Sequence, residues 1–136
     1  EITAFWEHAR YGFECKARPD FLIDDLNIIV DYKTCVDAGA EEFGKAAINR
    51  GYDIQASWYT QGLEIVTGKK FDFVFIAQEK TPPFAFAFYQ ATPEMLQRGA
   101  MRIINACSKF AHCLKANAWP GYRDEIQFIK MPYWAA

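Results

Sequence analysis

Two aspartates and a lysine on neighbouring strand-like segments are the residues of this sequence best suited to chemistry on a phosphate group. Asp31 and Lys33 lie two positions apart in the apolar segment 28–33, and Asp20 lies upstream, directly after Pro19. Because the side chains of a strand alternate between its two faces, Asp31 and Lys33 share one face, and the other face of the segment is apolar. The spacing therefore predicts a polar cluster on one face of an apolar strand.

A predicted hairpin brings Asp20 and Asp31 together. Residues 24–27 are good turn formers, and a four-residue loop there pairs Ile23 with Ile28 and, counting outward, Asp20 with Asp31. Directly opposed side chains have Cβ atoms about 4.5–5.5 Å apart, which suits two carboxylates that share one divalent cation. A register shift of one residue would put the two carboxylates on opposite faces, so the predicted site depends on this pairing.

The chemistry that this cluster predicts is metal-dependent hydrolysis of a phosphodiester. Mg²⁺ prefers oxygen ligands in octahedral geometry and usually keeps several waters. Asp20, Asp31, the backbone carbonyl of Tyr32, waters and a substrate phosphate would complete such a shell. The metal lowers the pKa of a bound water and polarises the phosphoryl oxygen. Lys33, beside it, is placed to orient the attacking water or to neutralise developing charge.

Gln55 and Tyr59 form a second candidate pair. They lie four positions apart in a predicted helix that starts with Asp53 as N-cap and ends near Thr67, with Gly68 as C-cap. Residues four apart share one face of a helix, and both side chains can hydrogen-bond to a phosphate or to a catalytic carboxylate. A structural role in capping or packing the helix is the alternative for this pair.

The elements that must position these residues are a mixed sheet and flanking helices. Predicted strands cover residues 2–7, 13–23 (interrupted by Pro19), 28–33, 71–78 and 84–90, and predicted helices cover 41–50, 53–67 and 93–115. Thr92 is the expected N-cap of the last helix, with Pro93 at its first position. The order β-β-β-α-α-β-β-α, with the three early strands in a meander, predicts an α/β (α+β) fold with a mixed central sheet.

Composition and charge limit the classes of protein. The 136 residues suffice for one domain, and 51% hydrophobic and 17% aromatic residues exclude a disordered chain. No apolar run is long enough to span a membrane. A net charge of −2 argues against a general nucleic-acid coat protein but is compatible with a nuclease, whose metal site needs carboxylates. The four cysteines form no Cys-x-x-Cys pair, so reduced thiols in or near the core are expected.

Three motifs in order resemble the RecE-type (exonuclease VIII) family, in the RecB-like branch of the PD-(D/E)xK nucleases. They are Cys-Lys-Ala-Arg-Pro-Asp-Phe-Leu at 15–22, Ile-Val-Asp-Tyr-Lys-Thr at 29–34 and Gly-Tyr-Asp-Ile-Gln-Ala-Ser-Trp-Tyr at 51–59. The tail Met-Pro-Tyr-Trp-Ala at 131–135 also resembles the C-terminal end of that family. Pro-Asp or Asp-x-Lys alone is a weak signal, but the two together with Gln-x-x-x-Tyr on the following helix are specific.

The resemblance implies a PD-(D/E)xK, restriction-endonuclease-like core and assigns a role to each candidate residue. Asp20 and Asp31 would bind Mg²⁺ or Mn²⁺, Lys33 would be the catalytic lysine, and Gln55 and Tyr59 would support DNA and the geometry of the site. The family degrades linear double-stranded DNA from its ends, 5′ to 3′, and leaves single strands for a single-strand annealing recombinase. Its members often form homo-oligomeric rings. A cytoplasmic protein, encoded by a bacterium or a phage, is expected.

One feature of the family pattern is missing. The fold normally has a helix before the first strand that carries a Glu or His of the site, and this chain has none. Either Glu1 is the remnant acid, or residues 1–136 are a single nuclease domain that lacks its N-terminal helical part, or this copy is impaired. Two other functions compete with the exonuclease: an endonuclease or junction resolvase on the same fold, and a catalytically silent DNA-binding module. A preference for free ends over closed circles separates the two nucleases.

Overall fold

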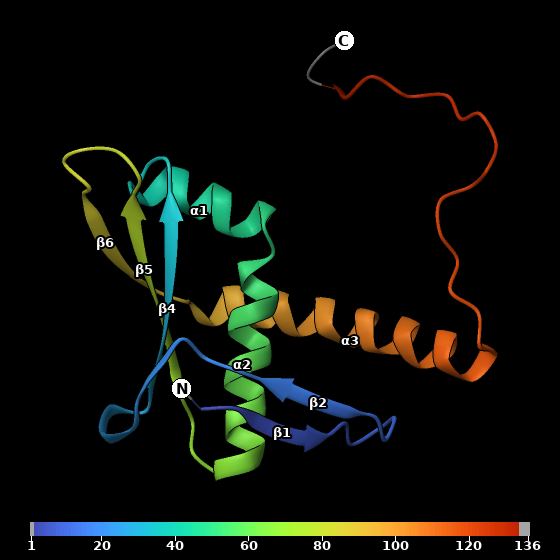
Figure 1. Cartoon of the computed structure of the whole chain (residues 1–136), viewed down its shortest axis with the longest axis horizontal. Coiled ribbons are helices and arrows are strands. Elements are labelled where there is room, and N and C mark those ends of the chain that lie inside the picture. The colour runs from blue at the N-terminus through green and yellow to red at the C-terminus, as the bar shows by residue number, and fades with distance from the viewer. Residues whose placement is uncertain (1, 134–136) are drawn as a thin grey trace.

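The computed structural model describes residues 2–133, in which two sheets and three α-helices are arranged as in Figure 1. In chain order the elements are β1 (Ala4–Glu7), β2 (Glu14–Ala17), β3 (Phe21–Ile23), the 3-10 turn η1 (Asp24–Leu26), β4 (Ile28–Cys35), α1 (Ala40–Asn49), α2 (Tyr52–Thr67), β5 (Asp72–Glu79), β6 (Phe86–Gln90) and α3 (Pro93–Ala116). Within the described residues, no helix is both long and apolar enough to cross a membrane.

The central sheet has four strands in the order β3-β4-β5-β6. Strands β4 and β5 are parallel, and the long connection that parallel strands require is supplied by α1 and α2. The two outer pairs, β3 with β4 and β5 with β6, are antiparallel hairpins. The sheet is therefore mixed, and the α/β fold class predicted from the order of the elements is confirmed.

The predicted register of the first hairpin of this sheet is confirmed. Ile23 pairs with Ile28, and Phe21 pairs with Val30. The loop between them is the 3-10 turn η1, closed by Asn27 in the left-handed conformation at φ 53°, which Asn adopts more readily than most residues. Asp20 follows directly beyond the paired end of β3 and therefore lies on the side of β4 that carries Asp31.

The early three-stranded meander predicted from the sequence is wrong. The segment expected as one strand is split into β2 and β3, and the break contains Pro19, which has no N–H to donate to a sheet. Strand β2 pairs with β1 in a separate two-stranded sheet that packs against α2. Trp6 of β1 and Trp58 of α2 make this contact, with ring centroids 5.0 Å apart.

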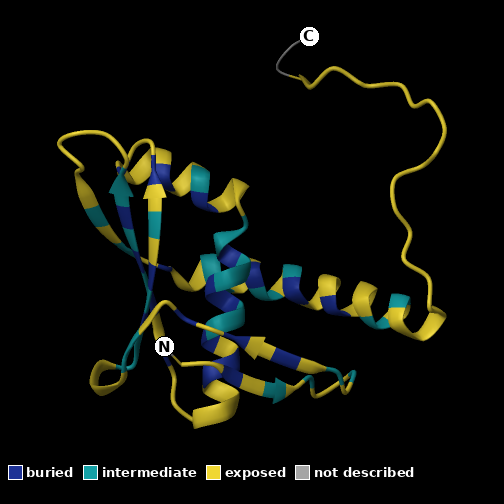
Figure 2. Ribbon diagram, in the orientation of Figure 1, coloured by how far each residue is buried: buried dark blue, intermediate teal, exposed yellow. Residues whose placement is uncertain are grey.

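Buried and more exposed residues alternate along β4 and β5 (Figure 2), so the two faces of the central sheet differ in burial. One face is covered by α1 and α2, and Ile29, Phe73 and Phe75 are almost completely buried there. The other face carries exposed aromatic side chains, among them Tyr32 and Phe88. Since Asp31 shares the parity of Ile29, the candidate carboxylate points into the covered side of the sheet, where burial strongly affects its charge.

The ends of the helices follow the sequence at two positions and depart from it at one. Thr92 caps α3, accepting a hydrogen bond from the backbone N–H of Met95 at 3.2 Å, and Gly68 ends α2 at φ 72°, both as predicted. The N-cap of α2 is Gly51 at φ 74°, a conformation that glycine adopts without strain. The prediction of Asp53 as N-cap is wrong, because this side chain is buried and binds arginines instead of the first turn.

The four cysteines are free thiols, as expected. Cys15, Cys35 and Cys107 are buried, and Cys113 is partly exposed. Burial raises the pKa of the first three, and the nearby Cys107 contributes to the rise at Cys15. A raised pKa keeps a thiol protonated and unreactive, so the three buried cysteines act as small apolar side chains.

Candidate active site

Asp31 is a carboxylate buried in the middle of the sheet. Its side chain is 1% exposed, and two residues hold it. Gln55 of α2 donates a hydrogen bond from Nε2 to Oδ1 of Asp31 at 2.6 Å, and Nζ of Lys33 lies 2.5 Å from Oδ2. Gln55 of α2 therefore contacts one oxygen of the carboxylate, and Lys33, on the same face of β4, contacts the other.

Asp20 is fixed beside β4 by the backbone. The β3–β4 pairing ends at Phe21, so the N–H of Tyr32 has no partner on β3. Oδ2 of Asp20 accepts a hydrogen bond from this N–H at 3.1 Å. The Asp20 carboxylate thus accepts the hydrogen bond that a further residue of β3 would otherwise accept. Asp20 is exposed and lies beside the buried Asp31.

The charges of the two carboxylates act on each other. Burial raises the pKa of Asp31 above its ordinary value, and the negative charge of Asp20 raises it further, whereas Lys33 and Gln55 oppose the rise. Burial and Asp20 prevail over these two partners, so the net effect disfavours the ionised form of Asp31. A cation that binds to both carboxylates would remove this repulsion.

One oxygen of Asp31 has a single close partner. Oδ2 is buried, and the ammonium group of Lys33 lies 2.5 Å from it in an ion pair. A carboxylate oxygen has two lone pairs, so Oδ2 can bind a ligand in addition to Lys33. With Asp20 adjacent, the oxygen donors present fit a hard divalent cation, which is often bound through only one or two carboxylates and retained waters.

Lys33 is held from two sides. Its side chain is 19% exposed, and Nζ lies between the Asp31 carboxylate and the ring of Tyr52, whose centroid is 4.9 Å away. A cation over an aromatic face is attracted by the ring quadrupole. These two restraints orient the ammonium group toward Asp31, and they give the first residue of α2 a place in the site.

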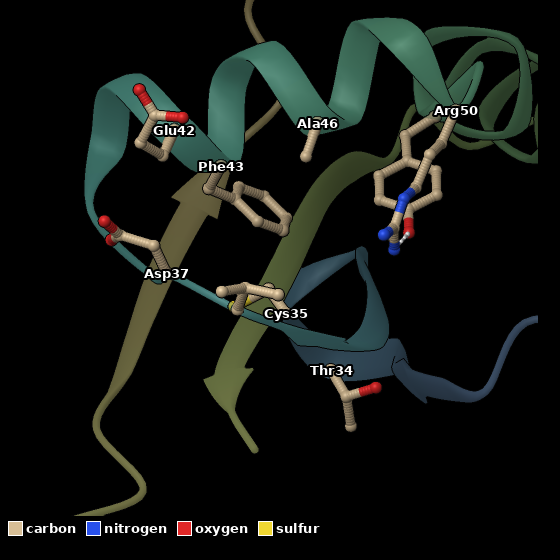
Figure 3. Close-up of a pocket in the computed structure, with 9 residues that line it drawn as sticks. Thr34, Cys35, Asp37, Glu42, Phe43, Ala46 and Arg50 are labelled. Carbon is tan, nitrogen blue, oxygen red and sulfur yellow. Dashed lines mark hydrogen bonds between the residues drawn. The ribbon is translucent and has the colours of Figure 1, made fainter. Parts of the chain in front are cut away.

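A cavity of about 400 Å³ lies next to this cluster, between the end of β4 and α1, and Figure 3 shows Cys35, Phe43 and Arg50 around it. Its lining residues are Thr34, Cys35, Val36, Asp37, Glu42, Phe43, Ala46, Arg50 and Tyr52. Arg50 donates from Nη1 to the Tyr52 hydroxyl at 3.4 Å. Tyr52 is thus shared by the cavity and by the Lys33 contact.

The structure brings four of the five predicted side chains together: Asp20, Asp31, Lys33 and Gln55. Tyr59 is placed elsewhere. Its ring packs at the hydrophobic core beside Phe73, with centroids 6.3 Å apart, and within the described residues it makes no hydrogen bond to the cluster. The prediction for Glu1 falls outside the described residues, as does that for the last residues of the tail motif, and between residues 2 and 133 no group of three or more His, Cys, Asp or Glu could hold a metal.

Sequence reasoning missed Tyr52. Its only signal was its position three residues before Gln55, which places both on one face of the helix. The aromatic contact with Lys33 joins β4 to α2, two elements whose packing the sequence pattern did not specify.

Comparison with known proteins agrees with the fold. A family model described as a PDDEXK-like domain of unknown function matches residues 1–132. A search of the curated proteins finds no significant match. A crystal structure described as a "Putative exonuclease" from Eubacterium rectale is similar with a TM-score of 0.69 at 20% sequence identity. The match covers 96% of this chain and 53% of that one, so the chain spans about half the length of that protein. The chain belongs to the family of PDDEXK-like domains of unknown function.

Proposed function

We propose that this chain is the catalytic core of a metal-dependent exodeoxyribonuclease of the RecE type, which hydrolyses linear double-stranded DNA from its ends, 5′ to 3′. The observation that carries the proposal is the buried Asp31 carboxylate, bonded to Gln55 and Lys33 and adjacent to Asp20. A binding module has no need of two carboxylates next to each other where an anionic phosphate must approach, whereas a metal-dependent hydrolase requires them.

The proposed ligands of Mg²⁺ or Mn²⁺ are Asp20, Asp31 and the backbone carbonyl of Tyr32. The N–H and C=O of one strand residue point toward the same neighbouring strand. Since the N–H of Tyr32 binds Asp20, its carbonyl faces the same side. A divalent cation held by these residues would supply a water of lowered pKa and would polarise a phosphoryl oxygen.

The remaining residues orient and stabilise. Lys33, fixed between Asp31 and Tyr52, presents a positive charge that orients the attacking water or offsets charge on the phosphate. Gln55 holds Oδ1 of Asp31, so that Oδ2, beside Lys33, is the oxygen that would bind a metal. Tyr59 contributes from within the core, where its ring fixes α2 against β5 and so supports the position of Gln55.

The substrate class follows from the proposed chemistry and the resemblance together. Linear duplex DNA is the proposed partner, and the single strands produced would serve a single-strand annealing recombinase. Retention of DNA would come from the homo-oligomeric ring that the resemblance implies. An endonuclease or resolvase with the same metal residues, and a silent DNA-binding module, are the alternatives that the experiment must separate.

The test is cleavage of linear and closed-circular duplex DNA in Mg²⁺, in Mn²⁺ and in EDTA. Linear DNA labelled at the 5′ or the 3′ end reports polarity, because degradation from the 5′ end releases the 5′ label first. Lys33→Ala should remove cleavage, whereas Lys69→Ala is the matched control, since that exposed lysine contacts only Asp24 in the turn at the far end of β4. Metal-dependent loss of linear DNA alone supports the exonuclease. Nicking of circles would favour the endonuclease, and no cleavage would favour the silent module.

A further inference from the structure

Asp53 is a buried carboxylate that the proposed chemistry does not use. It lies in the first turn of α2, two residues before Gln55, and is 0% exposed. Two arginines of α3 bind it, Arg98 at Oδ2 and Arg102 at Oδ1, the latter at 2.7 Å. Both guanidinium groups remain partly exposed, so only the carboxylate is fully removed from water.

The backbones of α2 and α3 meet at this carboxylate. Gly99 lies between the two arginines in sequence, and a Cβ at this position would overlap the backbone carbonyl oxygen of Asp53. It would also lie 2.7 Å from Cβ of Ser57. Any other residue at Gly99 would push the helices apart, so the ion pairs and the close approach fix the same point of α2.

Local capping does not fix that point. The N-cap of α2 is Gly51, which has no side chain to bind the free N–H groups of the first turn. Arg102 lies beside it, with Nη1 3.8 Å from the position that a Cβ of Gly51 would occupy. The start of α2 is therefore anchored by α3.

The first turn of α2 carries the two residues that hold the catalytic groups. Tyr52 contacts Lys33, and Gln55 binds Asp31 at 2.6 Å, on either side of Asp53 in sequence. Helix α3 begins three residues after β6, where Thr92 caps it. Helix α3, which follows the edge strand β6, is thus tied through its two arginines to the first turn of α2. Asp31 lies on β4, in the centre of the same sheet.

Stability alone does not account for this arrangement. A buried ion pair often contributes no more than well-packed apolar side chains of similar size, because desolvation offsets the attraction. Arginine–carboxylate contacts do, however, impose a definite geometry. Two such contacts on one carboxylate restrict rotation and sliding of α2.

We propose that Asp53, clamped by Arg98 and Arg102, is a positioning residue of the active site: it holds the first turn of α2 where Gln55 reaches Asp31 and Tyr52 reaches Lys33. The catalytic part of this inference rests on the proposed function, but the positioning part does not. The proposal predicts that Asp53 affects the active site only through Tyr52 and Gln55, the two residues of the first turn of α2 that contact it.

The first readout is the side-chain amide of Gln55 by NMR in metal-free protein. Asp53→Asn should shift its resonances toward those of a solvent-exposed glutamine and should speed exchange of its amide hydrogens. Asp24→Asn is the matched control, because it removes an exposed ion pair with Lys69 and should leave Gln55 unchanged. Arg98→Leu, which keeps the Arg102 contact, is the second variant if Asp53→Asn does not fold, and it should cause a smaller shift of the same kind.

The second readout is a double-mutant cycle on DNA cleavage. Asp53→Asn should lower kcat about ten- to a hundredfold in the wild-type background, as expected for a small misplacement of catalytic groups. In a background that lacks both contacts of that turn, Tyr52→Leu with Gln55→Ala, Asp53→Asn should lower kcat much less, although its effect on the melting temperature should be the same in both backgrounds. An equal loss of kcat in both backgrounds, or an unchanged Gln55 amide in the folded variant, would overturn the proposal. A wild-type protein without cleavage would refute the proposed function, and the NMR readout would still decide the clamp.

Discussion

Gln55 Nε2 and Asp31 Oδ1 lie 2.6 Å apart and join the covering helix to the central strand of the sheet. The contact orients the Asp31 carboxylate, so that Oδ1 faces α2 and Oδ2 faces Lys33. An amide that donates to one oxygen fixes the direction of the other, which suits a carboxylate that must bind a metal.

Gln55→Glu should impair the site more than loss of the side chain alone. The substitution keeps the shape but replaces the donor by a second carboxylate next to Asp31, so we expect a lower melting temperature without metal as well as slower cleavage. Gln61→Glu on the same helix is the control, because Gln61 is exposed and bonds only to Ser57. Thermal unfolding in EDTA measures the difference. Equal melting temperatures for the two variants would argue against a close Gln55–Asp31 contact.

Asp31→Ala should abolish cleavage and leave the fold intact. It removes a proposed metal ligand and at the same time relieves the repulsion between Asp31 and Asp20. Circular dichroism and the DNA cleavage assay, run on the same preparation, test both parts. Turnover at the wild-type rate in a folded Asp31→Ala protein would refute the assignment of the site.

Mg²⁺ should stabilise the folded chain, because binding to the native state alone raises its stability by about 2.7 kcal/mol at a hundredfold excess over Kd. The melting temperature should rise with millimolar Mg²⁺ in the wild-type protein, and either Asp20→Asn or Asp31→Asn should remove the rise. Asp72→Asn, at an exposed position of β5, is the control and should leave the rise unchanged. If the wild-type protein shows no shift, the two carboxylates do not share a cation.

The metal-free protein should lose stability as the pH rises past the ordinary pKa of a carboxyl group. Burial and Asp20 raise the pKa of Asp31, so between the unfolded and folded pKa values the native state binds a proton that the unfolded state has released. Over that window the free energy of unfolding falls with pH. Asp31→Asn carries no charge there and should be more stable than the wild type in EDTA at neutral pH. Parallel stability–pH curves for the two proteins would contradict this.

Two helix glycines should respond oppositely to alanine. A Cβ at Gly62 of α2 would overlap the ring of Trp6, so Gly62→Ala should destabilise the packing of the β1–β2 sheet by about 1–3 kcal/mol. Nothing lies near a Cβ at Gly44 of α1, so Gly44→Ala should stabilise by about 0.5–1 kcal/mol through helix propensity. Urea unfolding of both variants measures the contrast, and a stabilising Gly62→Ala would show that the β1–β2 sheet does not sit on α2 as described.

Local signals in the sequence specify most of the fold and the centre of the site. The turn formers at 24–27 determine the hairpin register that places Asp20 beside Asp31. The sequence predicts the interruption at Pro19 but not its consequence, because the choice of a new partner strand depends on packing of β1 and β2 against a distant helix.

The interpretation of Asp53 failed for a similar reason. An aspartate after a glycine and before an apolar segment is a good N-cap in isolation. The competing partners, Arg98 and Arg102, lie more than forty residues later in the chain. Local pattern cannot show which of the two environments an acidic side chain takes. The same holds for Tyr52, whose contact with Lys33 exists only once α2 is docked on β4.

The most direct test of the account is where a metal binds. Crystals of the wild-type chain soaked in Mn²⁺ should show one anomalous-difference peak within ligand distance, about 2.0–2.3 Å, of carboxylate oxygens from both Asp20 and Asp31, and the Asp31→Asn protein should show none there. A peak elsewhere, or no peak between the two aspartates at saturating Mn²⁺, would contradict the claim that these carboxylates form the metal site of a nuclease.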